Sequence, residues 1–356
     1  MKALILNSGL GSRMGVLTSE HPKCMTEISA RDTILSRQLR LIADSGIEEV
    51  VMTTGYYDTV LVKYCESLDL PLKITFVKNP VYDKTNYIYS IYCARDYLDD
   101  DIILMHGDLV FEIEVFDRVV ASPVSCMTVS STLPLPDKDF KAQIADGNVL
   151  KVGVDIFNDA MEAQALYHLK KDDWKVWLGK IIEFCETGRT KVYAENALNE
   201  LDGAANISAL DVRNMLCAEI DNPEDLAVVT SKLREVESRT VYFCFASDII
   251  RGRDVETIVR ARKLGKVIVG VLSDEVFIAS GRKPAVPASE RELILENIIG
   301  VDRVVCQKTV SYRENLEKFR PDIVVCSGIC DGPDPAVRNE ITSILASYGG
   351  KLIDLY

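Results

Sequence analysis

The sequence has 356 residues, of which 47% are hydrophobic and 27% are charged, as in an ordinary globular protein of about two domains. Forty-one basic against 54 acidic residues give a net charge of −13, so most of the surface would repel a polyanion and nucleic acid is excluded as an expected partner. No apolar stretch approaches the roughly 18 residues of a membrane span, and the first residues lack a signal-peptide pattern. We therefore expect a cytoplasmic protein with no membrane partner.

The cysteines and histidines exclude several kinds of site. Ten cysteines are scattered, and Cys326 and Cys330 form the only close pair, which favours reduced thiols over a disulfide framework. The three histidines, His21, His106 and His168, are far apart in the sequence. Neither a zinc site nor a serine-type triad has its expected local spacing.

Strands and helices alternate in the first half of the sequence. Apolar periodicity predicts strands at 3–6, 50–53, 72–77 and 102–105, and helices at 34–42 and 87–97. Such alternation favours a doubly wound α/β sheet. The pattern is less regular from Ser122 to Asn158, and aromatic and charged residues from Tyr167 to Tyr193 indicate helices that close over a cleft.

A second α/β series follows the polar stretch at 231–239. We expect strands at 241–245, 267–271, 302–306 and 323–326, and helices at 255–264 and 289–298. This restart predicts a domain boundary near Ser238. The expected architecture is a Rossmann-like, doubly wound α/β domain over residues 1–237, followed by a smaller Rossmann-like α/β domain over residues 238–356.

Two glycines follow the first strand directly, in the run Asn7-Ser8-Gly9-Leu10-Gly11-Ser12-Arg13. Backbone amides in such a loop can approach phosphate oxygens, although glycines at these turns often serve the turn alone. Arg13 and Lys23 add two cations nearby. A dinucleotide fingerprint would need a glycine at Met14, and a Walker A loop would need Gly-Lys-Ser/Thr, so neither motif is present.

Carboxylates follow two further segments. Asp108 ends the apolar run 102–108, where α/β sheets place their chemistry, although an aspartate that caps a turn or helix is the alternative. Glu219 and Asp221 are two residues apart, so a strand would place both on one face. One of these two could complete a metal site with Asp108.

The loop Gly9-Leu10-Gly11-Ser12-Arg13 followed by Pro22-Lys23 resembles the signature of the sugar-phosphate nucleotidylyltransferase superfamily. The resemblance covers most of residues 1–237. It implies that a nucleoside triphosphate binds over this loop, that Arg13 and Lys23 act as catalytic cations on its phosphates, and that Asp108 holds Mg²⁺. The nucleotide-binding residues that it implies here are Asn7, Gly9, Leu10, Gly11, Ser12, Arg13 and Lys23.

Three segments resemble, more narrowly, the choline-phosphate cytidylyltransferases. Glu219-Ile220-Asp221 is similar to their Glu-Ile-Asp ending, which assigns Asp221 to the metal shell and leaves the role of Glu219 open. The stretch at 82–90 is similar to a helix start of this subgroup and implies that Asn86 and Ser90 lie near the nucleotide or substrate.

The third segment, Tyr193-Ala194-Glu195-Asn196, resembles the Tyr-Trp-Glu-Asn segment near the amine in this subgroup, with alanine in place of tryptophan. It implies that Tyr193, Glu195 and Asn196 bind the substrate, and Tyr193 can hold a substituted ammonium by cation–π attraction. For Trp174 and Trp177, packing in the core is favoured over contact with a ligand. Tyr167 is a weaker candidate than Tyr193 for the contact with the ammonium.

Residues 241–353 resemble the small cytidylyltransferase domain of some phosphoenolpyruvate mutase fusions, through the stretches 247–250, 270–275, 290–291 and 296–305. That family uses a His-x-Gly-His loop, whereas this sequence has Arg251-Gly252-Arg253-Asp254. Asp254 stands where a developing negative charge would need a donor. We therefore expect a second domain that is catalytically inactive.

The combined features predict a nucleotidyltransferase that moves CMP from CTP to a small phosphate or phosphonate headgroup, with Mg²⁺ as cofactor. The acceptor is 2-aminoethylphosphonate or phosphocholine, so the expected partners are CTP and a phosphorylated or phosphonate amine. A sugar-1-phosphate nucleotidylyltransferase and a regulatory protein that binds a nucleotide without turnover are the alternatives. Self-association into a homo-oligomer is left open.

Overall fold

A computed structural model of the protein describes residues 1–9, 11–279, 281–327 and 334–355. The chain divides into two compact units, Met1–Leu233 (unit 1) and Arg234–Tyr356 (unit 2). The division falls within helix α7 (Pro223–Ser238), whose last residue is the boundary expected from the sequence. Each unit has its own sheet and its own apolar clusters, and is described by itself.

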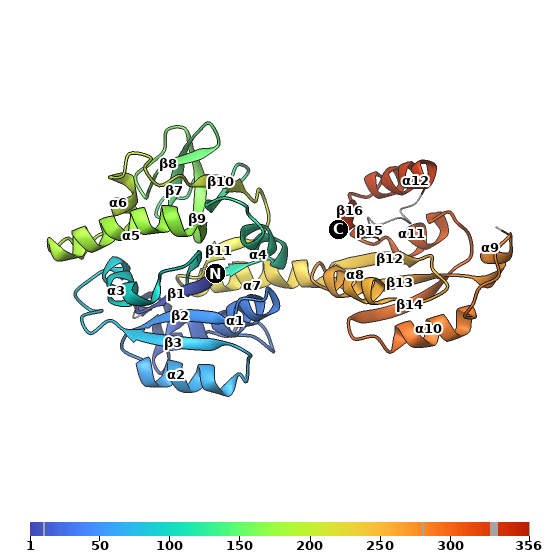
Figure 1. The fold of residues 1–356 in the computed structure, drawn as a ribbon, viewed down its shortest axis with the longest axis horizontal. Helices are drawn as coiled ribbons and strands as arrows, with labels where there is room; N and C mark the ends of the chain where they lie inside the picture. Colours follow the sequence, from blue (N-terminus) through green and yellow to red (C-terminus); the bar gives the residue numbers. More distant parts are fainter. Residues whose placement is uncertain (10, 280, 328–333, 356) are drawn as a thin grey trace. The chain divides into compact units, whose positions relative to one another are not determined.

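Unit 1 contains strands, α-helices and short 3₁₀ segments (η), and Figure 1 labels its α-helices and most of its strands. Its strands are β1 (Lys2–Asn7), β2 (Glu49–Thr54), β3 (Lys73–Lys78), β4 (Ile102–His106), β5 (Leu109–Phe111), β6 (Cys126–Ser130), β7 (Lys141–Ala145), β8 (Asn148–Gly153), β9 (Ala160–Leu169), β10 (Ser208–Asp211) and β11 (Cys217–Glu219). Its helices are η1 (Ser12–Thr18), η2 (Lys23–Met25), α1 (Ile34–Asp44), α2 (Asp58–Ser67), α3 (Tyr87–Ala94), η3 (Arg95–Tyr97), α4 (Ile113–Val120), α5 (Lys171–Glu186), α6 (Ala194–Asn199) and most of α7.

The main sheet of unit 1 has nine strands in the order β3-β2-β1-β4-β9-β6-β10-β8-β7. Strands β1 to β4 are parallel, as the alternation of strands and helices predicted, and β9 enters antiparallel between β4 and β6. The sheet is therefore mixed rather than wholly parallel. Strands β11 and β5 form a separate antiparallel pair.

The alternation of side chains along β1 divides the core of unit 1 into two layers. Ala3 and Ile5 pack on one face with residues of α1, α2 and α4. Leu4 and Leu6 pack on the other face with residues of α3, α5 and α6. Because both faces of the sheet are covered by helices, the ends of its strands are left to carry polar groups.

The least regular part of the sequence differs most from expectation. Residues 122–158, where no clear pattern was found, contain β6, β7 and β8. Tyr167 lies in β9 rather than in a helix, and α5 follows it. Trp174 and Trp177 of α5 are 1% and 0% exposed and donate to the carbonyl oxygens of Leu98 and Ala194, so packing is their role.

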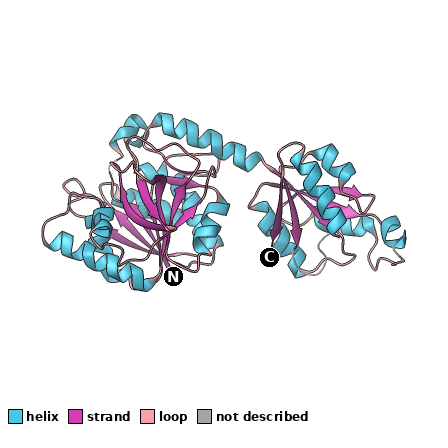
Figure 2. Cartoon of the chain, turned by 90° about the horizontal axis from the view of Figure 1, so that it is seen from above, coloured by secondary structure: helices cyan, strands magenta, loops and turns pink. Residues whose placement is uncertain are grey.

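Unit 2 is a smaller α/β unit with a parallel sheet in the order β14-β13-β12-β15-β16. Figure 2 shows helices beside the sheet of each unit. The elements of unit 2 are β12 (Thr240–Phe245), α8 (Gly252–Arg262), β13 (Lys266–Leu272), α9 (Asp274–Ala279), α10 (Ala288–Glu296), β14 (Val301–Gln307), α11 (Arg313–Phe319), β15 (Ile323–Ser327), α12 (Pro335–Ala346) and β16 (Lys351–Leu355). All six elements expected from the sequence are present. The α/β fold class is thus confirmed for both units.

The described ranges contain no helix with the length and apolar character needed to span a membrane.

Candidate active site

The carboxyl ends of β1 and β4 lie side by side in unit 1, with Leu6 opposite His106. The chain leaves β1 at Asn7 and β4 through Gly107, so the loop after β1 and Asp108 emerge at the same edge of the sheet. A Cβ atom on Gly107 would lie only 1.6 Å from Asn7 Oδ1, so a larger residue would clash there. The backbone therefore brings Asn7 next to the segment that carries Asp108.

The loop after β1 turns at Gly11, which has a φ of 63°, and a Cβ there would lie 2.9 Å from Lys23 Cβ. Thr18 Oγ1 donates to the Gly11 carbonyl oxygen at 3.0 Å and fastens the loop. The loop lines a cavity of about 280 Å³, whose residues include Asn7, Gly9, Gly11, Ser12, Arg13, Lys23, Asp108 and Asp221. Leu10, the other residue predicted in this loop, lies outside the described residues.

Lys23 is the centre of a charged cluster at this cavity. Its ammonium contacts Asp108 Oδ2 and lies 2.7 Å from Asp221 Oδ1, which also lies 2.8 Å from Arg13 Nη2. The Lys23 side chain is only 15% exposed. Burial disfavours its charge, but Asp108 and Asp221 outweigh that effect and raise the pKa of Lys23. All four of these predicted residues therefore converge at one place.

The two aspartates of this cluster offer oxygen donors, which are the ligands that Mg²⁺ prefers. Burial raises the pKa of Asp108, but Lys23 and His106 outweigh it, so the net pKa is lowered and the carboxylate form is favoured. Asp108 Oδ1 is buried and makes no hydrogen bond within the described ranges. The donor chemistry of Asp108 and Asp221 thus fits a divalent cation.

Asp108 also lines a second cavity, of about 710 Å³. Asn86 caps α3 by accepting a hydrogen bond from Tyr87 N at 2.7 Å, and Asn79 Nδ2 donates to Ser90 Oγ at 3.0 Å. These contacts hold the start of α3 at the cavity wall. The lining residues include Ser8, Gly9, Lys84, Thr85, Asn86, Tyr87, Ser90, His106, Asp108 and Lys191.

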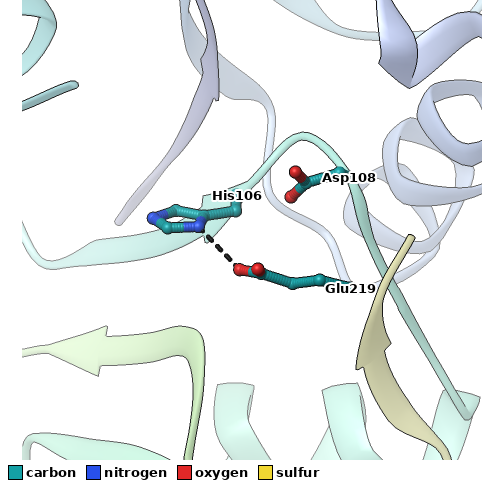
Figure 3. Close-up of side chains that lie close together, drawn as sticks. All are labelled: His106, Asp108 and Glu219. Carbon is teal, nitrogen blue, oxygen red and sulfur yellow. Dashed lines mark hydrogen bonds and ion pairs between the residues drawn. The ribbon is translucent and has the colours of Figure 1, made fainter. Parts of the chain in front are cut away.

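Beside Asp108 lies a pair that the sequence did not reveal, His106 and Glu219 (Figure 3). His106 Nδ1 donates to Glu219 Oε1 at 2.8 Å. Burial alone would lower the pKa of His106, but Glu219 outweighs it and raises the pKa to about 9. Possible ligand atoms of His106, Asp108 and Glu219 lie within 4.8 Å of one another. Strand β11 ends at Glu219, so Asp221 lies beyond the strand rather than on it, although both residues line a third cavity.

A third cavity, of about 220 Å³, is lined by aromatic and charged groups. Tyr193 is 38% exposed, and its ring lies edge-on to Phe140 with centroids 5.1 Å apart. Tyr87 forms a further wall, 5.9 Å from Tyr193 between ring centroids. The remaining lining residues are Arg13, His106, Asp108, Lys138, Asp139, Val154, Glu219 and Asp221.

Glu195 and Asn196, both predicted to bind substrate, are not among the residues that line these cavities. Glu195 is 1% exposed, and its two carboxylate oxygens accept hydrogen bonds from Tyr87 and Tyr167. Asn196 Oδ1 accepts from Tyr193 N at 2.9 Å. Glu195 is therefore buried and held by two tyrosines, so its predicted substrate contact would have to act through Tyr87. Asn196 is exposed, and its contact with the substrate stays a prediction.

Sequence reasoning did not identify Phe140, Asp139, Lys138 and Tyr87 as site residues, and it gave His106 no role. Residues 138–140 belong to the irregular stretch at 122–158, and only the pairing of β7 with β9 brings them to the site. The signal for Tyr87 was present, because it follows the helix-capping Asn86 directly. His106 stands two residues before Asp108 at a strand end, where a pocket-facing residue is expected.

In unit 2, the sequence Arg251-Gly252-Arg253-Asp254, which stands in place of the expected His-x-Gly-His loop, forms the start of helix α8. Asp254 is 8% exposed and accepts a hydrogen bond from Arg251 N at 2.8 Å, which caps the start of α8. Arg251 and Arg253 flank this cap. The carboxylate of Asp254 therefore serves the fold of unit 2.

The family described as "MobA-like NTP transferase domain" matches residues 3–130. Unit 1 carries a nucleotidyltransferase domain. The matched residues include the loop after β1, Lys23 and Asp108, while Glu219 and Asp221 lie beyond them.

Three curated relatives of the chain carry names from CMP chemistry: one is a synthase of a CMP-linked phosphonate and two are cytidylyltransferases. A CMP-5'-(3-aminopropyl)phosphonate synthase of Streptomyces rubellomurinus is 35% identical over 47% of this chain and 26% of its own length. A CTP:phosphoglutamine cytidylyltransferase of Campylobacter jejuni is 29% identical over 43% of this chain and 62% of its own. A 2-aminoethylphosphonate cytidylyltransferase of Lancefieldella rimae is 25% identical over 63% of this chain and 90% of its own length. The chain thus spans about a quarter of the first of these relatives and under two thirds of the second.

A solved structure supports the fold of unit 1. The inositol-1-phosphate CTP transferase from T. maritima superposes with a TM-score of 0.53 at 21% identity, covering 66% of this chain and 96% of that one. The likeness confirms the mixed α/β nucleotidyltransferase fold.

Proposed function

We propose that unit 1 transfers CMP from CTP to a small amine that carries a phosphate or phosphonate group, and releases pyrophosphate. The acceptor is 2-aminoethylphosphonate or phosphocholine. The observation that carries this proposal is that three cavities, one lined by the phosphate loop, one by α3 and one by aromatic rings, share Asp108. Such an arrangement suits a triphosphate, a nucleoside and an acceptor that meet at one point.

The reaction needs no nucleophile from the protein. An anionic oxygen of the acceptor attacks the α-phosphorus of CTP, a new P–O bond forms, and the bond to the bridging oxygen of the β-phosphate breaks to release pyrophosphate. Arg13 and Lys23 neutralise the phosphates, and the amides of the loop after β1 donate to their oxygens. Asp108 and Asp221 would hold Mg²⁺, which supplies charge stabilisation to the phosphoryl oxygens when it is bound.

The aromatic cavity supports an amine as the far end of the acceptor. A substituted ammonium over Tyr193, Phe140 or Tyr87 gains roughly 0.5–2 kcal/mol per cation–π contact. Asp139 and Glu219 add negative charge at the same cavity. The relatives named for aminoalkylphosphonates support a phosphonate acceptor in preference to phosphocholine.

The test is a matrix of nucleotides and acceptors with full-length protein and Mg²⁺. CTP and UTP are each combined with 2-aminoethylphosphonate, phosphocholine, phosphoethanolamine and glucose 1-phosphate, and pyrophosphate release is measured. We expect release with CTP and a phosphorylated or phosphonate amine. Release only with UTP and the sugar phosphate would instead support a sugar nucleotidylyltransferase, and binding of CTP without any release would support a regulatory role.

A further inference from the structure

One buried carboxylate in unit 1 has no role in the reaction described above. Glu195 of α6 is 1% exposed, yet it contacts Tyr87, a residue that lines two cavities. Tyr167 OH of β9 donates to its Oε1 at 3.0 Å, and Tyr87 OH at the start of α3 donates to its Oε2. The carboxylate therefore connects three elements that are distant in the sequence.

The ring held by this carboxylate borders both cavities. Tyr87 lines the cavity of about 710 Å³ and the aromatic cavity of about 220 Å³. Its ring meets His106 with centroids 4.7 Å apart and Tyr193 with centroids 5.9 Å apart. A shift of this one ring would change the space for the nucleoside and for the acceptor together.

We propose that Glu195 is a positioning residue that fixes the Tyr87 ring as the common wall of the nucleotide and acceptor cavities. This inference rests on the proposed function. In-line transfer needs the acceptor oxygen and the α-phosphorus in near-attack geometry, and a misplacement of about 1 Å can cost about 100-fold in rate. Loss of the contact should therefore lower kcat more than it raises either KM.

The fixed neighbours of Glu195 strengthen this assignment. Trp177 Nε1 donates to the Ala194 carbonyl oxygen at 3.0 Å, which anchors the start of α6. Asn86 N donates to the Thr190 carbonyl oxygen at 2.8 Å, which ties the start of α3 to the segment before α6. Glu195 and Tyr87 thus extend from two elements that are already joined, so their contact can hold a defined geometry.

The test is a double-mutant cycle in the full-length protein, with Tyr87→Phe, Glu195→Ala and the double variant. Tyr87→Phe keeps the ring and removes only the hydroxyl that reaches Glu195. We expect each single variant to lower kcat about 10- to 100-fold and the double variant to be no slower than the slower single, because both break the same contact. Glu195→Gln retains an acceptor for the Tyr87 hydroxyl and should recover most of the rate.

Leu198→Ala is the matched control, because Leu198 lies on the same helix and packs in the core. It should lower the melting temperature and keep kcat in the folded protein. Additive effects of Tyr87→Phe and Glu195→Ala, or an unchanged kcat in folded Glu195→Ala, would overturn the proposal. If Glu195→Ala does not fold, the decision rests on Tyr87→Phe, which keeps the ring, and an unchanged kcat in that folded variant would overturn the proposal.

Failure of the proposed function gives a different result. If the wild-type protein binds CTP and transfers no CMP to any acceptor, the proposed function fails. The double-mutant cycle is then repeated with the dissociation constant for CTP as the measured quantity, because Tyr87 also lines the nucleotide cavity. Non-additive losses of affinity would support the positioning role, and additive or absent losses would overturn it.

Discussion

The two units use the polar groups at their strand ends differently. In unit 1, buried polar atoms of Asn7, His106 and Asp108 lie near the ends of β1 and β4 without hydrogen-bond partners in the described structure. In unit 2, Arg291 is fully buried and its Nη2 lies 2.7 Å from Asp274 Oδ1, while Asp254 caps α8. Among the described residues, polar atoms of Asn7, His106 and Asp108 are therefore left open in unit 1, whereas Arg291, Asp274 and Asp254 of unit 2 are paired within that unit. Buried groups without partners mark where a ligand would complete the structure.

The largest expected effect comes from replacing an aspartate by asparagine in unit 1, and the same replacement in unit 2 is its control. Asp108→Asn should lower the rate of pyrophosphate release at saturating CTP by about 100-fold or more, because it weakens charge stabilisation worth several kcal/mol. Asp274→Asn should leave the rate of the folded protein unchanged and lower the melting temperature, because Arg291 loses its charged partner. Equal loss of rate in both variants would erase the distinction between the units.

The next effect concerns the cations. Lys23→Ala should reduce turnover of CTP by about 10- to 100-fold, since hydrogen bonds to charged groups contribute about 1.5–3 kcal/mol and Lys23 faces the phosphate cavity. Arg251→Ala in unit 2 is the matched control and should keep wild-type turnover. Kinetics and calorimetric titration with CTP measure both. If Lys23→Ala binds and turns over CTP as the wild type does, the segment from Pro22 to Lys23 is a structural turn.

A smaller effect is expected at the aromatic cavity. Tyr193→Ala should raise the KM for the amine acceptor about 3- to 30-fold and leave the KM for CTP nearly unchanged, because a cation–π contact contributes roughly 0.5–2 kcal/mol. Tyr97→Ala removes an exposed tyrosine away from this cavity and is the control. Equal increases in both KM values would indicate general loss of the site.

The smallest expected effect is a pH dependence confined to unit 1, which holds all three histidines. The pKa of His106 in the folded protein is about 9, above its ordinary value of 6.5, because the Glu219 carboxylate stabilises the protonated imidazole against the effect of burial. Its contribution to stability is therefore complete below pH 6.5 and is lost as the pH rises through 9. The pKa of His168 is lowered by burial, so its contribution changes below pH 6.5 and not in this window.

Thermal unfolding between pH 6.5 and 9.5 measures this effect. The transition of unit 1 should move to lower temperature as the pH rises, and His106→Gln should flatten that shift. A wild-type slope that persists in His106→Gln would assign the pH dependence to another group.

Local patterns were enough to predict the parallel strands β1 to β4 and to single out the loop after β1 and Asp108. The loop glycines, Arg13 and Lys23 lie within a short segment, and Asp108 follows an unmistakable apolar strand, so each carried its own signal. Asp221, which contacts Lys23 as Asp108 does, could also be singled out, because it stands in a short acidic segment that resembles a family ending.

The rest of the site depends on contacts between distant segments. Phe140 reaches Tyr193 only because β7 pairs with β9, and Glu195 meets Tyr87 and Tyr167 across separations of 108 and 28 residues. The burial of Glu195 behind Tyr87 and Tyr167 has no periodic signal in the short helix α6. Such features follow from packing, which a reading of local periodicity does not contain.

The most direct test of the central claim is ³¹P NMR of a mixture of full-length protein, Mg²⁺, CTP and 2-aminoethylphosphonate, with phosphocholine in a parallel sample. We expect the phosphorus signal of one acceptor to be replaced by that of its CMP conjugate, with one equivalent of pyrophosphate, and no conversion over the same time with Asp108→Asn. Conversion of neither acceptor by the wild type, or equal conversion by Asp108→Asn, would contradict the assignment of the open strand ends of unit 1 as the site of CMP transfer.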